Sequence, residues 1–173
     1  MSREIKVRYD DLEDRIQVTL GVAGRLHHLL LTRRVWSAAR MSMQRMLDLS
    51  AEVPASLPRS MRESISAAHH HAVASQTQSA VGPALERGVP EDAVLVTHLR
   101  IGQRRRKGEA DAPADWVLIF KVHGRADLRL VLGDKLMHAL VGALMRRELS
   151  ANWGLPTLPA RSALAQGGKP TLQ

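Results

Sequence analysis

The densest run of charge in the 173-residue sequence is Arg104, Arg105, Arg106 and Lys107, which lies between two long apolar segments. Guanidinium groups can bind phosphate through two parallel hydrogen bonds, and adjacent cations can follow a phosphate backbone. Three carboxylates follow before residue 116 and partly neutralise the run. The run therefore predicts either a nucleic-acid-binding loop or a solvated loop whose charges protect a sheet edge from aggregation.

A second pair of cations, Arg33 and Arg34, opens a predicted helix directly after the capping residue Thr32. Backbone N–H groups at a helix start attract anions, and two guanidinium groups would strengthen such a site. A cation in the first turn costs only about 0.3–1 kcal/mol when it is exposed. Solvated arginines are therefore the alternative to a dedicated anion site.

Eight histidines raise the question of a metal site. His69, His70 and His71 are consecutive, so on a helix they point about 100° apart. A helical pair of histidine ligands is spaced by four residues, whereas positions 65 and 73 hold Ile and Val. We therefore predict no metal site and no cofactor, unless segments far apart in the sequence converge.

Signatures of enzymes are missing from the sequence. It contains no G-x-S-x-G, H-E-x-x-H or G-x-G-x-x-G pattern, and the "GGKPT" of residues 167–171 lacks the Ser or Thr that a phosphate-binding loop needs after its lysine. The chain has no cysteine, which excludes a thiolate nucleophile and every cysteine-based zinc site. We expect a protein that is not an enzyme.

The overall charge indicates an anionic partner. The net charge is +8 and the sequence pI is about 10.9, which suits nucleic acid or an acidic protein. Only 3% of the residues are aromatic, so recognition through stacked bases is limited. The most apolar run outside the strands, residues 136–145, is shorter than the roughly 20 residues that cross a bilayer. With a charged N-terminus that lacks a signal-peptide core, this favours a cytoplasmic protein without membrane contact.

Hydrophobic periodicity predicts an α+β fold. Apolar residues alternate over residues 3–9 and 15–20, residues 25–32 are mostly apolar, and three- and four-residue spacing predicts a helix over 33–50. The same order of three strands and a helix recurs over residues 93–101, 116–122, 127–132 and 134–150.

The recurrence predicts an internal duplication into two βββα units, residues 1–50 and 93–153, each an antiparallel sheet packed by one helix. Residues 24–50 and 124–150 share six identities, where chance gives about two. Residues 51–92 would be a linker with a weak helix, and residues 154–173 a disordered tail, in one compact domain overall.

We therefore expect a non-catalytic basic protein that contacts nucleic-acid phosphates through Arg33, Arg34 and residues 104–107. The alternative is an adaptor or structural subunit that forms a homo-oligomer or docks on an acidic protein. Its apolar contacts would come from the "WVLIF" segment, residues 116–120, and from the methionine-bearing helix over 33–50.

Overall fold

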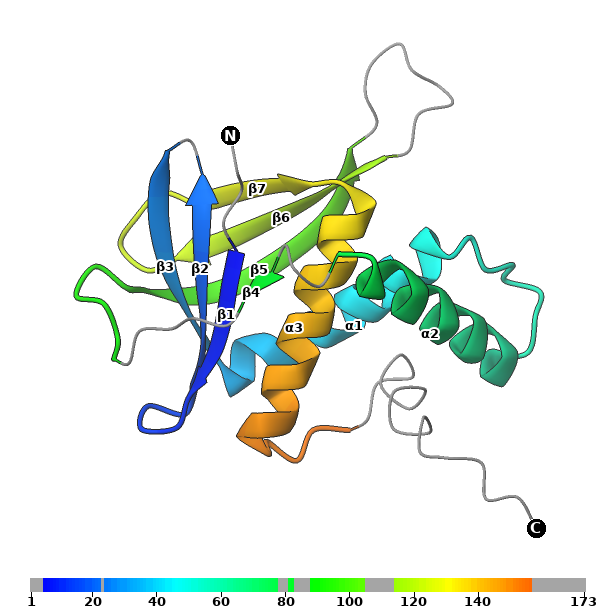
Figure 1. Cartoon of the computed structure of the whole chain (residues 1–173), viewed down its shortest axis with the longest axis horizontal. Helices are drawn as coiled ribbons and strands as arrows, with labels where there is room; N and C mark the ends of the chain where they lie inside the picture. The colour runs from blue at the N-terminus through cyan, green and yellow to red at the C-terminus, as the bar shows by residue number, and fades with distance from the viewer. Residues whose placement is uncertain (1–4, 23, 78–80, 83–87, 105–113, 157–173) are drawn as a thin grey trace.

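The computed structural model describes residues 5–22, 24–77, 81–82, 88–104 and 114–156. Over these residues the protein has an α+β fold with one mixed sheet of seven strands and three helices (Figure 1). The strand order across the sheet is β4-β1-β2-β3-β5-β6-β7.

The N-terminal strands form an antiparallel meander that leads directly into a helix. Its elements are β1 (Ile5–Asp10), β2 (Arg15–Val22), β3 (Arg25–Thr32) and α1 (Arg33–Ser50). The alternating residues face the core as expected, with Ile5, Ile16 and Val18 almost fully buried. The Thr32 hydroxyl accepts a hydrogen bond of 3.3 Å from the Val35 amide, so the predicted cap is confirmed.

The C-terminal strands form a second antiparallel meander that also ends in a helix. Its elements are β5 (Val94–Arg104), β6 (Asp115–Val122), β7 (Leu128–Leu132) and α3 (Asp134–Ala151). Between the two meanders lie α2 (Arg59–Ser75), where the sequence predicted a weak helix, and the short strand β4 (Val81–Gly82), which it did not predict.

The expectation that the sheets are antiparallel only is wrong, because the seven strands form one mixed sheet. β3 pairs in parallel with β5, through Leu29 with Val94 and Leu30 with Leu95, and this pairing joins the two meanders. β4 adds a second parallel pairing at the edge of β1. The sheet is mixed because α1 and the segment carrying α2 separate β3 from β5, which leaves room for the crossover that parallel pairing requires.

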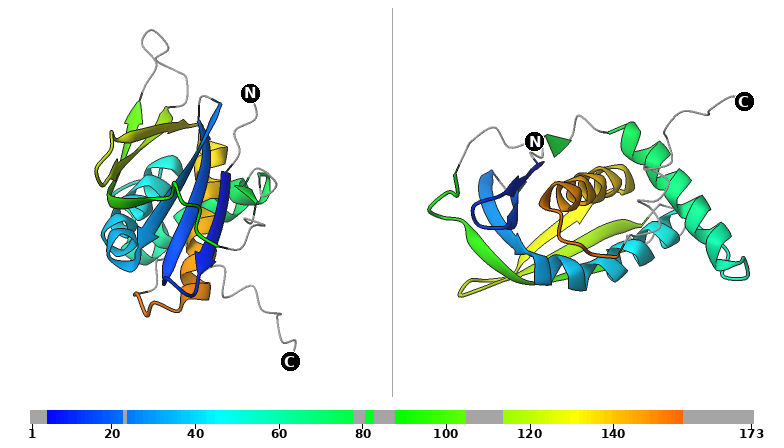
Figure 2. Two further views of the ribbon diagram at one scale, coloured as in Figure 1. Left: turned by 90° about the vertical axis from the view of Figure 1, so that its left-hand side faces the viewer. Right: turned by 90° about the horizontal axis from the view of Figure 1, so that it is seen from below.

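The helices pack across the two meanders. α1 lies mainly against β5, whereas α3 lies against β1, β2 and β4. The third helix, α2, packs on α3 and α1. The sheet curves around α3, as the view from below shows most clearly (Figure 2). α1 and α3 thus each pack chiefly on a strand of the other meander. The predicted duplication is not confirmed.

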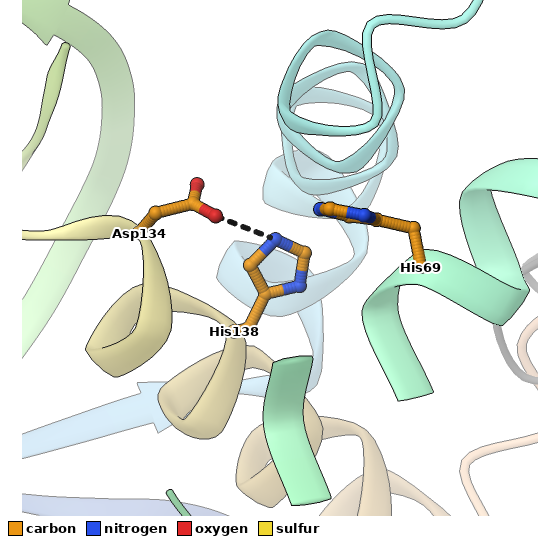
Figure 3. A group of neighbouring side chains, drawn as sticks. All are labelled: His69, Asp134 and His138. Carbon is orange, nitrogen blue, oxygen red and sulfur yellow. Dashed lines mark ion pairs between the residues drawn. The ribbon is translucent and has the colours of Figure 1, made fainter. Parts of the chain in front are cut away.

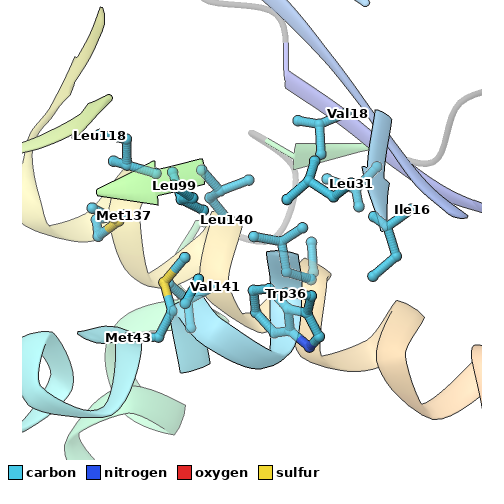
Figure 4. Close-up of a cluster of buried hydrophobic side chains, with 14 of the residues drawn as sticks. Ile16, Val18, Leu31, Trp36, Met43, Leu99, Leu118, Met137, Leu140 and Val141 are labelled. Atoms are coloured by element: carbon cyan, nitrogen blue, oxygen red, sulfur yellow. The ribbon is translucent and has the colours of Figure 1, made fainter. Parts of the chain in front are cut away.

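A hydrophobic core joins the sheet to α1 and α3 (Figure 4). Ile16 and Leu31 meet Trp36 of α1, and Leu118 faces Met137 of α3. Most residues that the adaptor hypothesis assigned to an apolar contact are buried: Trp116, Leu118, Phe120, Met43 and Met46 belong to this core, and Val117 is buried as well. Of the same two segments, Ile119 is half-buried, and Met41 and Leu49 on α1 are exposed.

A buried ion pair holds α1 against α3. Arg40 Nη2 lies 3.3 Å from Glu148 Oε1, and the two side chains are 7% and 2% exposed. The other carboxylate oxygen of Glu148 accepts a hydrogen bond of 2.8 Å from Trp36 Nε1. This pair fixes the relative position of the two helices whose ends form the site described below.

The helix α2 lies in the segment that the sequence predicted to be a linker with a weak helix, residues 51–92. α2 spans 17 residues, and Ser66, Ala67, His70 and Ala74 are buried against its neighbours. The predicted tail, residues 154–173, lies outside the described residues after Pro156. None of the described helices is both long and apolar enough to cross a membrane.

Candidate functional site

The two predicted anion-binding groups lie at different ends of the fold (Figure 1). Arg33 and Arg34 are both exposed at the start of α1. Hydrogen bonds from Trp153 and Tyr9 lower the pKa of the Asp14 carboxyl group, and the Arg33 charge lowers it further by a smaller amount. The charge of Arg33 thus acts on a carboxylate of the β1–β2 turn without forming one of the ion pairs found among the described residues.

The other predicted group begins at the end of β5. Arg104 is exposed and forms an ion pair of 3.2 Å with Asp115, its partner in the β5–β6 ladder. Arg105, Arg106 and Lys107 lie outside the described residues. The structure thus places Arg104 beside a carboxylate and away from Arg33 and Arg34.

Strands β5, β6 and β7 carry further basic side chains on one face. His98, Arg100 and Arg104 alternate along β5 on the side opposite the buried Leu99. Across the ladders His98 pairs with Lys121, and Ile119 pairs with both Arg100 and Arg129. Directly paired residues share a face of the sheet. We call this surface the outer basic face and define it by five residues: His98, Arg100, Arg104, Lys121 and Arg129.

Sequence analysis missed Arg100 and Arg129, although a signal existed. Both sit at outward positions of strands that alternate with a period of two, so each could have been assigned to the surface. Which strands would be neighbours depends on long-range pairing, which the alternation does not specify.

A second constellation lies where the three helices meet. Ser50 is the last residue of α1, His69 and His70 lie in the middle of α2, and Asp134 and His138 occupy the first turns of α3. One ligand atom from each of His69, Asp134 and His138 lies within 4.8 Å of the others (Figure 3). Segments that are far apart in the sequence therefore bring three possible metal ligands together, which the sequence left open.

Hydrogen bonds connect these side chains through the Ser50 hydroxyl. It donates to Asp134 Oδ1 over 2.7 Å. It also lies 2.8 Å from His138 Nε2 and 3.3 Å from His69 Nε2. Trp116 Nε1 donates a further bond of 2.8 Å to the same Asp134 oxygen. The carboxylate is thus anchored from the α1 end and from strand β6.

Behind His138 lies a second imidazole. His70 Nδ1 and His138 Nδ1 are 2.8 Å apart, and both residues are almost fully buried. Burial lowers the pKa of His70 to about 4, and lowers the pKa of His138 to about 4 although the Asp134 charge opposes it. Both rings are neutral at pH 7, so one ring carries its proton on Nδ1 and donates a hydrogen bond to the Nδ1 lone pair of the other.

The constellation is not a serine–histidine–aspartate triad. In a triad the aspartate accepts from His Nδ1 and the serine faces Nε2. Here Asp134 and Ser50 both lie on the Nε2 side of His138, at 3.6 Å and 2.8 Å, and the Nδ1 side faces His70. The aspartate therefore cannot orient the imidazole as the base for Ser50.

The arrangement instead has the donor set of a metal site. Two imidazoles and a carboxylate suit first-row transition metals, and neutral imidazoles have a lone pair to offer. The sequence carried one signal for it: Asp134 and His138 are four residues apart and so share a helix face. Spacing between histidines alone does not reveal this pair.

Comparison with known proteins adds no family assignment. No protein-family model, no curated protein and no solved structure shows significant similarity to the chain.

Proposed function

We propose that the protein is a non-catalytic nucleic-acid-binding protein that contacts phosphates through its outer basic face. The observation that supports this is the gathering of His98, Arg100, Arg104, Lys121 and Arg129 on one side of β5, β6 and β7. Arg100 and Arg129 are both exposed, and among the described residues no carboxylate forms an ion pair with either.

The spacing of these cations suits a polymer of phosphates. Neighbouring strands lie about 4.8 Å apart, so Arg100 on β5 and Arg129 on β7 are about 10 Å apart with Ile119 between them. Arg100 and Arg104 are four residues apart along β5, which is about 13 Å. Separate guanidinium groups can therefore neutralise separate phosphates. In sequence, Arg105–Lys107 extend this charge directly from the end of β5.

Recognition of bases contributes little in this proposal. Only 3% of the residues in the chain are Phe, Tyr or Trp, and base stacking on such rings supplies much of the sequence-tolerant affinity of single-strand binders. Binding then depends mainly on phosphate contacts, which position a nucleic acid without reading its sequence. Affinity is expected to fall steeply with salt.

Fluorescence anisotropy of labelled single-stranded DNA, single-stranded RNA and duplex DNA tests the proposal. The wild type is expected to bind at about 50 mM salt and to lose most of its affinity at about 200 mM. Arg100→Ala/Arg129→Ala should weaken binding of every sequence by a similar factor. The control is Arg45→Ala/Arg59→Ala, which removes the same net charge from exposed positions on α1 and α2.

Two outcomes would overturn the proposal. One is the lack of any nucleic-acid binding at the lower salt concentration. The other is an equal loss in the test and control variants, because net charge alone would then explain the affinity. Tighter binding of polyglutamate than of nucleic acid would identify an acidic protein as the partner instead.

A further inference from the structure

The meeting point of the three helices carries an inference that is independent of nucleic-acid binding. We propose that His69, Asp134 and His138 bind a divalent transition-metal ion, with Zn²⁺ as the probe. Two of these ligands come from α3 and one from α2, so the ion would connect the two helices (Figure 3).

The distances between the ligand atoms are compatible with one ion after small side-chain movements. A tetrahedral ion with bonds of about 2 Å holds its ligand atoms about 3.3 Å apart. His138 Nε2 and Asp134 Oδ2 already lie 3.6 Å apart. The widest separation in the set is within 4.8 Å, so His69 needs to approach by rotation of its side chain.

Each side chain presents the atom that ligation requires. Ser50 and Trp116 both donate to Asp134 Oδ1, which leaves Oδ2 as the oxygen that faces His138. When His138 donates a hydrogen bond from Nδ1–H to His70 Nδ1, the lone pair of the His138 ring is on Nε2, on the side of Asp134 and His69. Such outer hydrogen bonds orient the ligands of metal sites and set the imidazole tautomer.

The burial pattern leaves one side of the site accessible. His138 and His70 are almost fully buried, whereas Ser50, His69 and Asp134 are half-buried. Three protein ligands with an accessible side leave a position for water or another small ligand. Imidazole ligands favour Zn²⁺ and its neighbours over Mg²⁺ or Ca²⁺, which prefer shells of oxygen.

The same hydrogen bonds also form a satisfied network without a metal. Ser50 donates to Asp134 and can accept N–H bonds from both His138 Nε2 and His69 Nε2. Ligation requires a lone pair at both Nε2 atoms, so each imidazole then carries its proton on Nδ1, and His138 becomes the donor in its hydrogen bond with His70. Binding of Zn²⁺ at this site therefore distinguishes the metal arrangement from the metal-free one.

Isothermal titration of untagged full-length protein with Zn²⁺, with Mg²⁺ as a comparison, separates the two arrangements. We expect the Zn²⁺ isotherm to show one ion bound per chain, and its dissociation constant gives the affinity of this site. We expect no comparable binding of Mg²⁺. His69→Ala should weaken that affinity tenfold or more, since even outer partners of metal ligands change it by about 10–100-fold. The matched control is His71→Ala, which removes the neighbouring exposed histidine from the same helix.

A second variant guards against a folding defect. Asp134→Asn keeps an oxygen for the hydrogen bonds from Ser50 and Trp116 but removes the negative charge, so it should also weaken Zn²⁺ binding. Thermal melts in a chelator confirm that the variants are folded. Lack of Zn²⁺ binding by the wild type, or equal losses in His69→Ala and His71→Ala, would overturn the proposal.

Discussion

Removing the charge of Glu148 tests the contact that fixes α1 against α3. The variant Glu148→Gln leaves the Arg40 guanidinium buried without its carboxylate, while the amide oxygen of glutamine can still accept the hydrogen bond from Trp36. The expected effect is therefore that of an unpaired buried charge and not that of a cavity. Breaking one partner of a buried pair costs about 3–5 kcal/mol.

The low end of that range applies because Arg40 retains a second partner. Its Nη2 also donates to the carbonyl oxygen of Pro156. We expect a loss of about 3 kcal/mol in the free energy of unfolding. For a chain of this length that corresponds to a fall of roughly 6–12 °C in Tm.

Urea denaturation and calorimetry of four proteins measure the effect: the wild type, Glu148→Gln, Arg40→Met and Arg40→Met/Glu148→Gln. Removing the guanidinium as well should restore most of the stability, because no unpaired charge is then buried. A Glu148→Gln loss below about 0.5 kcal/mol would refute this reasoning, as would strictly additive losses in the double variant.

Two further predictions concern the interior around the histidines. With metal chelated, stability should fall as the pH drops from about 6.5 to about 5, since the pKa of His70 and that of His138 are lowered to about 4 and the unfolded chain takes up those protons first. Denaturant melts across this pH range measure the free energy of unfolding, and a value that does not change with pH would contradict the prediction. The variant His70→Leu should reduce the slope of the free energy of unfolding against pH. Gly142→Ala should raise the free energy of unfolding by up to about 1 kcal/mol through helix propensity. The added Cβ would lie 3.5 Å from Arg146 Nη1 and 3.6 Å from His70 Nε2, which is ordinary contact distance. A loss of stability in the same assay would show that α2 and α3 approach more closely.

Local patterns predicted most elements of the fold. Strand alternation identified β1, β2 and β7, and the spacing of apolar residues with the Thr32 cap identified α1. β4 was missed because two residues carry no periodicity. The sequence patterns predicted only a weak helix where α2 lies, because the buried face of α2 consists of small and polar residues such as Ser66 and Ala67 and not of a hydrophobic stripe.

Long-range arrangement was beyond those patterns. Periodicity tells which face of α1 is buried but not that β5 covers it. For the same reason the outer basic face and the His69–Asp134–His138 set depend on neighbours that are distant in sequence. Within the His69–Asp134–His138 set, only the four-residue spacing of Asp134 and His138 can be seen in the local sequence.

The slope of nucleic-acid affinity against salt concentration tests the central claim most directly. Each lost phosphate contact lowers the magnitude of that slope by about 0.7 for a single strand. Arg100→Ala/Arg129→Ala should therefore reduce it by about 1.4, and Arg45→Ala/Arg59→Ala should leave it unchanged. An unchanged slope in the first variant would show that the outer basic face of β5, β6 and β7 does not contact the phosphates.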